Sequence, residues 1–221
     1  MVDAMPRVPE PEPMDIAEEA QVYAQADFAE VNAGFVARLL ELVGPQEAGL
    51  ALDLGTGPGD IPRRVIRERP AWRIVAADVS LPMLGYVHRA VEPDGAIHAL
   101  CMDAKTAPFP PGVFDIIFSN SILHHVSDTD RFWAEVRRVA KPHALVFLRD
   151  LARPASRAAA ADIVAQYAGT ETGLLREEFY RSLLSAYTPD EVRGQLARSG
   201  LAQLRVAMSS DRHLDICGTI A

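Results

Sequence analysis

The chain has 221 residues, of which 49% are hydrophobic and 24% charged, and its formal net charge at neutral pH is −8. This length allows one sizeable hydrophobic core and is short for two, so we expect a single domain. An acidic chain is a poor partner for the phosphate backbone of a nucleic acid. A small molecule is therefore the expected binding partner.

The cysteines and the hydropathy pattern bear on the compartment. Cys101 and Cys217 are the only cysteines and lie far apart in the sequence, which predicts neither a disulfide scaffold nor a zinc site. We expect Cys101 to lie in a buried strand. No apolar run has the length of a membrane span, and the first residues lack a signal-peptide pattern. The sequence favours a cytoplasmic monomer or homodimer with no membrane span.

The opening of the chain differs in composition from the rest. Residues 1–20 contain four prolines and six acidic residues against one basic residue, Arg7, which predicts a flexible acidic segment. Apolar residues then recur at helical spacing over residues 21–43, until Gly44 and Pro45. We expect a leading amphipathic helix there, within a single domain over residues 21–221.

A glycine-rich turn follows the first expected strand. Residues 51–60 read ALDLGTGPGD, and glycines without a Cβ let the turn take positive φ and let a ligand approach the backbone closely. A dinucleotide-binding fingerprint needs its third glycine one residue later, and Pro58 removes an N–H that a phosphate would use. Asp53 adds a negative charge before the turn. These features favour a nucleoside ligand that carries an ammonium or sulfonium group.

With DLGTGPG, the turn resembles motif I of the class I S-adenosylmethionine-dependent methyltransferases. The style of the motifs is similar to the ubiquinone/menaquinone-biosynthesis type, a small-molecule branch of that family. The resemblance implies S-adenosyl-L-methionine as cofactor and S-adenosyl-L-homocysteine as product. It also implies these cofactor-binding residues at the turn: Asp53, Gly55, Thr56, Gly57 and Gly59.

The second expected strand, Arg73–Asp78, is an apolar run that closes on a carboxylate. In dinucleotide binders and in the methyltransferases, an acid at this place accepts hydrogen bonds from ribose hydroxyls. We interpret Asp78 as that acid and not as a helix cap, because Ser80 is better placed to cap the helix that follows. The resemblance implies that the adenine lies among Val79, Met83, Met102, Asp103 and Ala104.

Residues 114–126 read FDIIFSNSILHHV, a buried strand that turns polar at Ser119. Ligands lie beyond the carboxyl ends of strands in an open α/β sheet, so we expect Ser119, Asn120 and Ser121 to face the reactive end of the cofactor. The stretch resembles motif IV of the family. It lacks the Asn-Pro-Pro-Tyr pattern of enzymes that methylate amino groups of nucleic-acid bases.

Two histidines follow this strand. Because adjacent residues point to different sides, we expect only one of them to face the pocket. By resemblance, the first position of the pair lies on the acceptor side, so we expect His124 to face the substrate as a candidate catalytic base and His125 to be structural. The alternative is that both are hydrogen-bonded scaffold residues. By resemblance, the leading segment folds over the cofactor and brings Tyr23 to it; packing of Tyr23 on the sheet is the alternative reading.

The second half of the chain supplies the remaining elements. We expect a helix from Asp128 or Thr129, a strand near residues 144–150, helices over 155–168 and 174–184, a helix opened by a capping box at Thr188, and strands over 204–209 and 213–219. His143 stands where the family usually has a glycine, and histidine tolerates the left-handed conformation that this turn requires.

Residues 154–187 form a candidate substrate lid. An apolar stripe at helical spacing is usually core, so a helix pair packed only for stability is the alternative. The substrate-side candidates are Arg149, Phe179, Tyr180 and Tyr187.

These elements predict an α/β protein with a Rossmann-like, doubly wound sheet of seven mostly parallel strands, one of them antiparallel, and helices on both faces. The implied reaction is methyl transfer, without a metal, to an O, N, S or C atom of a small-molecule acceptor. One alternative is an NAD(P)-dependent oxidoreductase, although its fingerprint and a Tyr-x-x-x-Lys dyad are missing from the sequence. The other is a non-catalytic module that binds a nucleoside cofactor.

Overall fold

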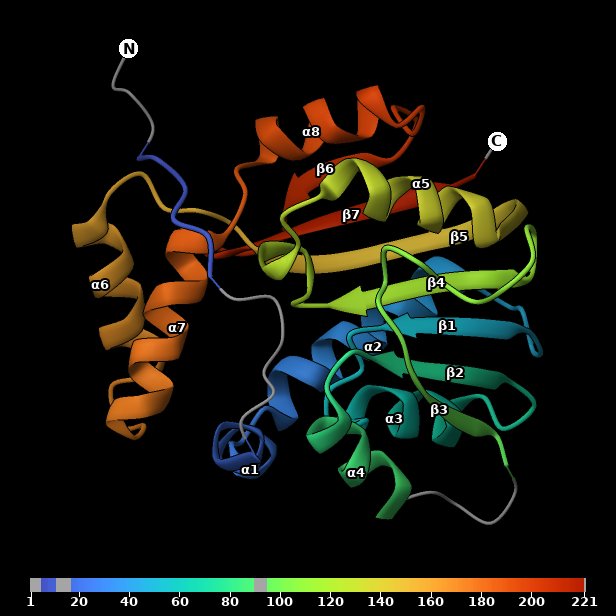
Figure 1. Cartoon of the computed structure of the whole chain (residues 1–221), viewed down its shortest axis with the longest axis horizontal. Helices are drawn as coiled ribbons and strands as arrows, with labels where there is room; N and C mark the ends of the chain where they lie inside the picture. Colours follow the sequence, from blue (N-terminus) through green and yellow to red (C-terminus); the bar gives the residue numbers. More distant parts are fainter. Residues whose placement is uncertain (1–4, 11–16, 90–94, 221) are drawn as a thin grey trace.

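Seven strands form one sheet in the order β3-β2-β1-β4-β5-β7-β6 in the computed structural model, which describes residues 5–10, 17–89 and 95–220 (Figure 1). β7 runs antiparallel to both neighbours, β5 and β6, and the other pairs are parallel. The predicted α/β fold with one antiparallel strand is thus confirmed. The strands are β1 (Leu50–Leu54), β2 (Arg73–Asp78), β3 (Ile97–Cys101), β4 (Phe114–Asn120), β5 (Ala140–Leu151), β6 (Arg205–Met208) and β7 (His213–Thr219).

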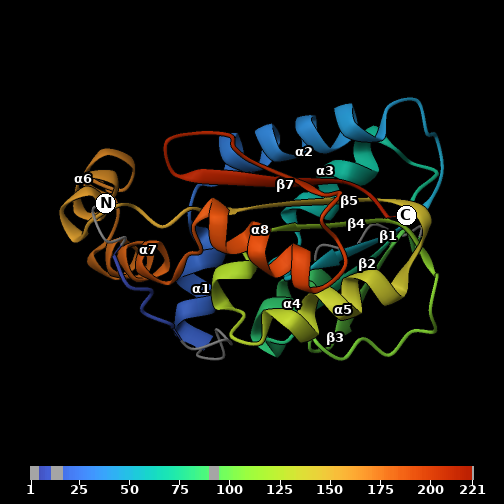
Figure 2. The same cartoon turned by 90° about the horizontal axis from the view of Figure 1, so that it is seen from above.

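Helices cover both faces of the sheet. In the view from above, α2 and α3 lie on one side of the sheet, and α5 and α8 on the other (Figure 2). None of the helices within the described ranges combines the length and the apolar character that crossing a membrane requires. The helices are α1 (Ala17–Gln25), α2 (Ala29–Val43), α3 (Asp60–Glu68), α4 (Leu81–Arg89), the 3₁₀ helix η1 (Leu123–His125), α5 (Thr129–Val139), α6 (Arg157–Tyr167), α7 (Gly173–Ser185) and α8 (Pro189–Arg198).

Aromatic packing joins α2 to the centre of the sheet. The ring of Phe35 stacks on Phe147 of β5 at 4.7 Å between centroids and lies 6.2 Å from Phe118 of β4. All three side chains are fully buried. The apolar stripe of the leading helix therefore forms part of the core that fixes β4 and β5, the strands that carry one side of the site.

The leading helix is not continuous. It is divided into α1 and α2 by a turn in which the Asp27 carboxylate accepts a hydrogen bond from the backbone N–H of Ala29 at 3.0 Å. Cys101 is exposed, not buried as expected, because β3 is an edge strand. The prediction for His143 is confirmed: it takes the left-handed conformation, with φ of 65°.

Part of the opening segment is anchored. We expected residues 1–20 to be flexible, yet Val8 donates a backbone hydrogen bond to Leu184 of α7 at 3.0 Å. Arg7 donates to the carbonyls of Ser185 and His124 at 2.6 and 2.7 Å, and its guanidinium lies 4.2 Å from the ring centroid of Tyr187. Residues 1–4 and 11–16 lie outside the described residues. The segment around Arg7 is therefore tied to α7 and η1 by a charged side chain with several partners.

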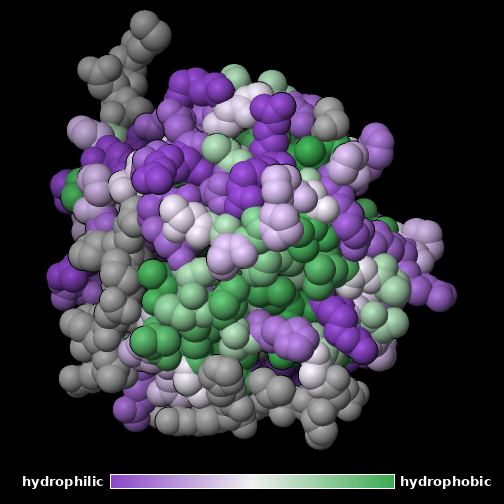
Figure 3. Space-filling view, turned by 45° about the vertical axis from the view of Figure 1, so that its right-hand side comes forward, coloured by the Kyte–Doolittle hydropathy of each residue, from purple (hydrophilic) through white to green (hydrophobic). Residues whose placement is uncertain are grey.

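The connection between β3 and β4 is unusual. Residues 102–113, all of them described, contain three prolines and no helix, so this crossover leaves one side of β1–β3 thinly covered. Leu50, Val75 and Leu100 pack against the main core but remain partly exposed. Figure 3 shows a broad apolar area on the face of the molecule that lies toward the right of Figure 1.

We expect Phe35→Ala to lower the free energy of unfolding by about 3–5 kcal/mol, because it leaves a cavity between α2 and two central strands. Val31→Ala is the matched control on the same helix, since Val31 is 36% exposed, and it should cost well under half as much. Denaturant unfolding measures both. Equal losses would contradict the assignment of Phe35 to the core.

Candidate functional site

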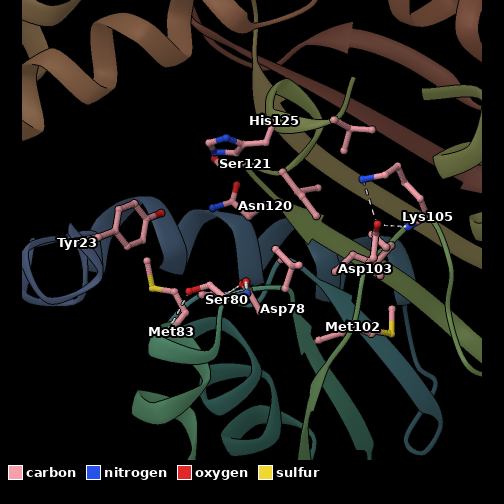
Figure 4. Close-up of a pocket in the computed structure, with 18 residues that line it drawn as sticks. Tyr23, Asp78, Ser80, Met83, Met102, Asp103, Lys105, Asn120, Ser121 and His125 are labelled. Carbon is pink, nitrogen blue, oxygen red and sulfur yellow. Dashed lines mark hydrogen bonds and ion pairs between the residues drawn. The ribbon is translucent and has the colours of Figure 1, made fainter. Parts of the chain in front are cut away.

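A cavity of about 250 Å³ lies beyond the carboxyl ends of β1, β2 and β4. In Figure 4, Tyr23 and Met83 lie on one side of it, Asp103 and Lys105 on the other, and Asp78 between them. The expected residues that line it are Tyr23, Gly55, Gly57, Asp78, Val79, Met83, Met102, Asp103, Ala104, Asn120 and Ser121. The lining residues that the sequence did not predict for the site are Leu54, Ala77, Ser80, Lys105, Ile122, His125 and Val126.

The three glycines of the turn have different tasks. All have positive φ: 71° at Gly55, 54° at Gly57 and 79° at Gly59. A Cβ on Gly55 would meet Ile122 at 2.9 Å, and a Cβ on Gly59 would meet Val87 at 2.9 Å. The nearest atom to a Cβ on Gly57 is 3.9 Å away. Gly55 and Gly59 are thus needed for close packing within the protein, and Gly59 does not line the cavity. Gly57 leaves room on the cavity side for a ligand.

Asp78 holds the turn against the end of β2. Its Oδ2 accepts from the backbone N–H of Gly57 and its Oδ1 from that of Ser80, both at 2.8 Å. A carboxylate oxygen can accept more than one hydrogen bond, and Asp78 also lines the cavity. The carboxylate therefore both fixes the loop and presents acceptors to the cavity.

The opposite wall is built on Asp103. Its Oδ1 accepts from the backbone N–H of Lys105 at 2.8 Å and pairs with the Lys105 ammonium at 3.2 Å. Met102 and Ala104 flank it along the cavity wall. This wall places apolar side chains beside a carboxylate, the combination that a planar apolar ring with a polar edge needs. Lys105, two residues after the predicted aspartate, was not expected at the cavity.

Besides Gly59, three expected cofactor residues are buried and do not line the cavity: Asp53, Thr56 and Ser119. Asp53 is 1% exposed, and its Oδ2 has no hydrogen-bond partner among the described residues. Burial raises the pKa of Asp53 to about 7, and nearby Thr56, itself buried, offsets only part of this effect. The hydroxyl of Ser119 donates to the carbonyl of Leu54 at 2.6 Å and so links β4 to β1.

Tyr23 comes to the cavity from α1 and packs on Phe28 at 4.9 Å between ring centroids. Burial raises its pKa to about 12, with the negative charges of Asp78 and Asp150 adding to the effect. The phenol therefore stays neutral near neutral pH and offers a hydroxyl to the cavity.

The two histidines are placed in the opposite way from our expectation. His125 lines the cavity, whereas His124 is 3% exposed and lies behind it. The residues form a 3₁₀ helix and not an extended segment, and Asp150 draws His124 inward, with 2.6 Å between His124 Nδ1 and Asp150 Oδ1. Burial alone would lower the pKa of His124, but the neighbouring Asp150 carboxylate outweighs it and raises that pKa. The interpretation of His124 as the histidine that faces the pocket is therefore wrong.

The substrate-side candidates do not line the cavity either. Arg149 makes a two-pronged contact with Asp215 on β7, at 2.7 and 2.8 Å. Phe179 and Tyr180 pack on the apolar cluster between α6 and α7. The hydroxyl of Tyr187 donates to the carbonyl of Val126 at 2.7 Å and so supports a lining residue from behind.

Comparison with known proteins matches residues 52–148 to a methyltransferase domain family. The chain is 33% identical over 112 residues to the ubiquinone/menaquinone biosynthesis C-methyltransferase of Desulfotalea psychrophila, covering 51% of this chain and 45% of that protein. It is 30% identical over 173 residues to the demethylmenaquinone methyltransferase of Thermotoga maritima, covering 74% of each chain.

In structure, the chain is similar to a SAM-dependent methyltransferase from Aquifex aeolicus, with a TM-score of 0.67 and 21% identity, over 91% of this chain and 98% of that one. The chain spans about half the length of several curated relatives that it matches. The sequence relatives and the structural neighbour are all methyltransferases, as the glycine turn at the end of β1 had indicated. The chain belongs to the class I S-adenosylmethionine-dependent methyltransferases of the ubiquinone/menaquinone-biosynthesis type.

Proposed function

We propose that this protein transfers a methyl group from S-adenosylmethionine to a small-molecule acceptor. The observation that carries the proposal is the pair formed by Gly57 and Asp78: a glycine with open space on the cavity side, hydrogen-bonded to a carboxylate at the end of the second strand. This is the arrangement that a nucleoside with a ribose diol requires.

The residues present fit this cofactor. Asp78 would accept hydrogen bonds from the ribose hydroxyls, and Met83, Met102 and Asp103 would enclose the adenine. Asp53 is a buried carboxyl with an unpartnered oxygen, which suits a ligand with a positive charge nearby. The cofactor supplies a methyl group that is already activated on a sulfonium. The protein's task is therefore to position the reactants and to exclude water.

On the acceptor side, Asn120, Ser121 and His125 supply the polar groups. Where the acceptor must lose a proton, His125 is the cavity-lining histidine that can take it. The names of the relatives make a quinone precursor the first acceptor to test. The segment 154–187 would then contact the acceptor only indirectly, through Tyr187 behind Val126.

We expect the purified protein to bind S-adenosylhomocysteine with micromolar or tighter affinity in calorimetry and not to bind NAD. Tight binding of NAD with no response to S-adenosylhomocysteine would favour the oxidoreductase alternative. Release of S-adenosylhomocysteine in a screen of metabolites then tests catalysis. Binding without turnover on any quinone precursor or other metabolite would favour the non-catalytic module.

Asp78→Ala should weaken S-adenosylhomocysteine binding by about tenfold to a thousandfold, because it removes charge-assisted hydrogen bonds to the ribose and releases the N–H of Gly57. Asp162→Ala, an exposed change on α6, is the matched control and should leave the dissociation constant unchanged. An Asp78 variant that keeps its fold and its affinity would refute the ribose assignment.

Gly57→Val should abolish cofactor binding while the circular dichroism spectrum stays near native. A side chain at this φ of 54° is strained and projects into space that no protein atom fills. Gly34→Ala is the control, since a Cβ there meets nothing within 4 Å. Retained affinity in Gly57→Val would show that the turn is not the cradle.

A further inference from the structure

Three potential metal ligands meet at the edge of the cofactor cavity, and one of them, His125, also lines it. They are the carboxylate of Glu10, from the anchored opening segment, and the imidazoles of His124 and His125, from η1. One ligand atom from each lies within 4.8 Å of the others. We propose that these side chains bind a single divalent cation of the zinc class. This inference concerns metal binding itself and does not depend on the methyl acceptor.

The two distances from Glu10 to the histidines match tetrahedral coordination, and one ligand atom from each of the three residues lies within 4.8 Å of the others. Glu10 Oε1 lies 3.5 Å from His124 Nε2 and 3.4 Å from His125 Nδ1. Ligand atoms at about 2.0–2.1 Å from a tetrahedral Zn²⁺ stand about 3.3–3.5 Å apart. Neighbouring ligands of an octahedral ion at about 2.0–2.1 Å stand only about 3.0 Å apart. Two imidazoles and one carboxylate are also a ligand set that zinc accepts, with the fourth position left for water or another oxygen ligand.

Asp150 orients one of the ligands. His124 Nδ1 lies 2.6 Å from Asp150 Oδ1, and in the neutral tautomer whose N–H faces this carboxylate the Nε2 lone pair is directed toward Glu10. Asp150 is itself held by the backbone N–H groups of Leu123 and Leu151. A carboxylate behind a histidine in this way fixes the tautomer and strengthens the histidine as a ligand.

Glu10 is brought to the histidines by specific contacts. Ser182 donates to Glu10 Oε1 at 3.1 Å, and the backbone N–H of Glu10 donates to the hydroxyl of Ser185 at 3.3 Å. Figure 1 shows this blue segment running beside α7, whose residues supply both serines. The carboxylate is therefore positioned and is not a chance surface charge: its side chain is only 8% exposed.

The charges around the cluster favour a cation. Glu10 and Asp150 are buried carboxyl groups on either side of His124, 3.5 Å from its Nε2 and 2.6 Å from its Nδ1. Arg7 is the positive group that faces the cluster, through its contact with the carbonyl of His124. A divalent ion would balance both negative charges, those of Glu10 and Asp150. Protonation of His124 would supply only one positive charge against the same two carboxylates.

The test is metal binding by the full chain after treatment with a chelator. We expect calorimetry to give one Zn²⁺ per chain, and Co²⁺ to give the visible spectrum of a tetrahedral site. Glu10→Gln and His125→Asn should each weaken Zn²⁺ binding by more than the 10–100-fold that loss of an outer partner costs. The matched controls, the exposed Glu47→Gln and His98→Asn, should bind as the wild type does.

Absence of stoichiometric Zn²⁺ binding by the wild type would overturn the proposal, and would leave the cluster as a protonated His124 between carboxylates. Equal binding by the cluster variants and the controls would overturn it as well. If a cluster variant does not fold, X-ray absorption of the Zn²⁺-loaded wild type decides: two imidazoles with oxygen ligands support the site, and a spectrum without imidazole refutes it.

Discussion

The site depends on one carboxylate, that of Asp78. Because it accepts from the N–H of Gly57 and from that of Ser80, it joins the turn after β1 to the turn after β2. The backbone N–H groups of Gly55 and Thr56 both reach the carbonyl of Ala77, so the two loops share a second connection at the same point. The positive φ of Gly57 is what allows this approach. The cavity floor is therefore fixed before any ligand enters.

A second layer supports the other side of the cavity. Ser119 links the end of β4 to Leu54 of β1, and Asp150 at the end of β5 holds η1 through Leu123 and His124. Tyr187, which precedes α8, donates a hydrogen bond from its hydroxyl to the carbonyl of Val126. These buried polar contacts put Asn120, Ser121 and His125 at the edge of the cavity, where they can meet an acceptor. The residues that shape the site are thus more numerous than those that would touch a ligand.

The fold and many of the residues that line the cavity were predictable from the sequence for a physical reason. Parallel strands are buried on both faces and read as continuous apolar runs, and a turn such as that of Gly55, Gly57 and Gly59 needs residues without a Cβ. The histidine that lines the cavity was not predictable in the same way. Whether His124 or His125 faces the cavity depends on the 3₁₀ turn at Leu123 and on Asp150, which is distant in sequence.

The roles of Asp53, Thr56, Gly59 and Ser119 also required the three-dimensional structure. For Asp53 on β1 and Ser119 on β4, the direction of the side chain along the strand decides whether it reaches the cavity. Thr56 and Gly59 lie in the turn after β1, and none of the four residues lines the cavity. The approach of Glu10 to the histidines had no sequence signal at all. The composition of its segment predicted flexibility, and the contacts of Arg7, Val8 and Glu10 with α7 show why the segment lies there.

A crystal structure of the protein with bound S-adenosylhomocysteine tests the central claim most directly. The account predicts the ribose hydroxyls on the carboxylate of Asp78, the adenine between Met83 and Met102, and the homocysteine part passing over Gly57. A nucleoside bound elsewhere, or one in this cavity whose ribose makes no contact with Asp78, would contradict it.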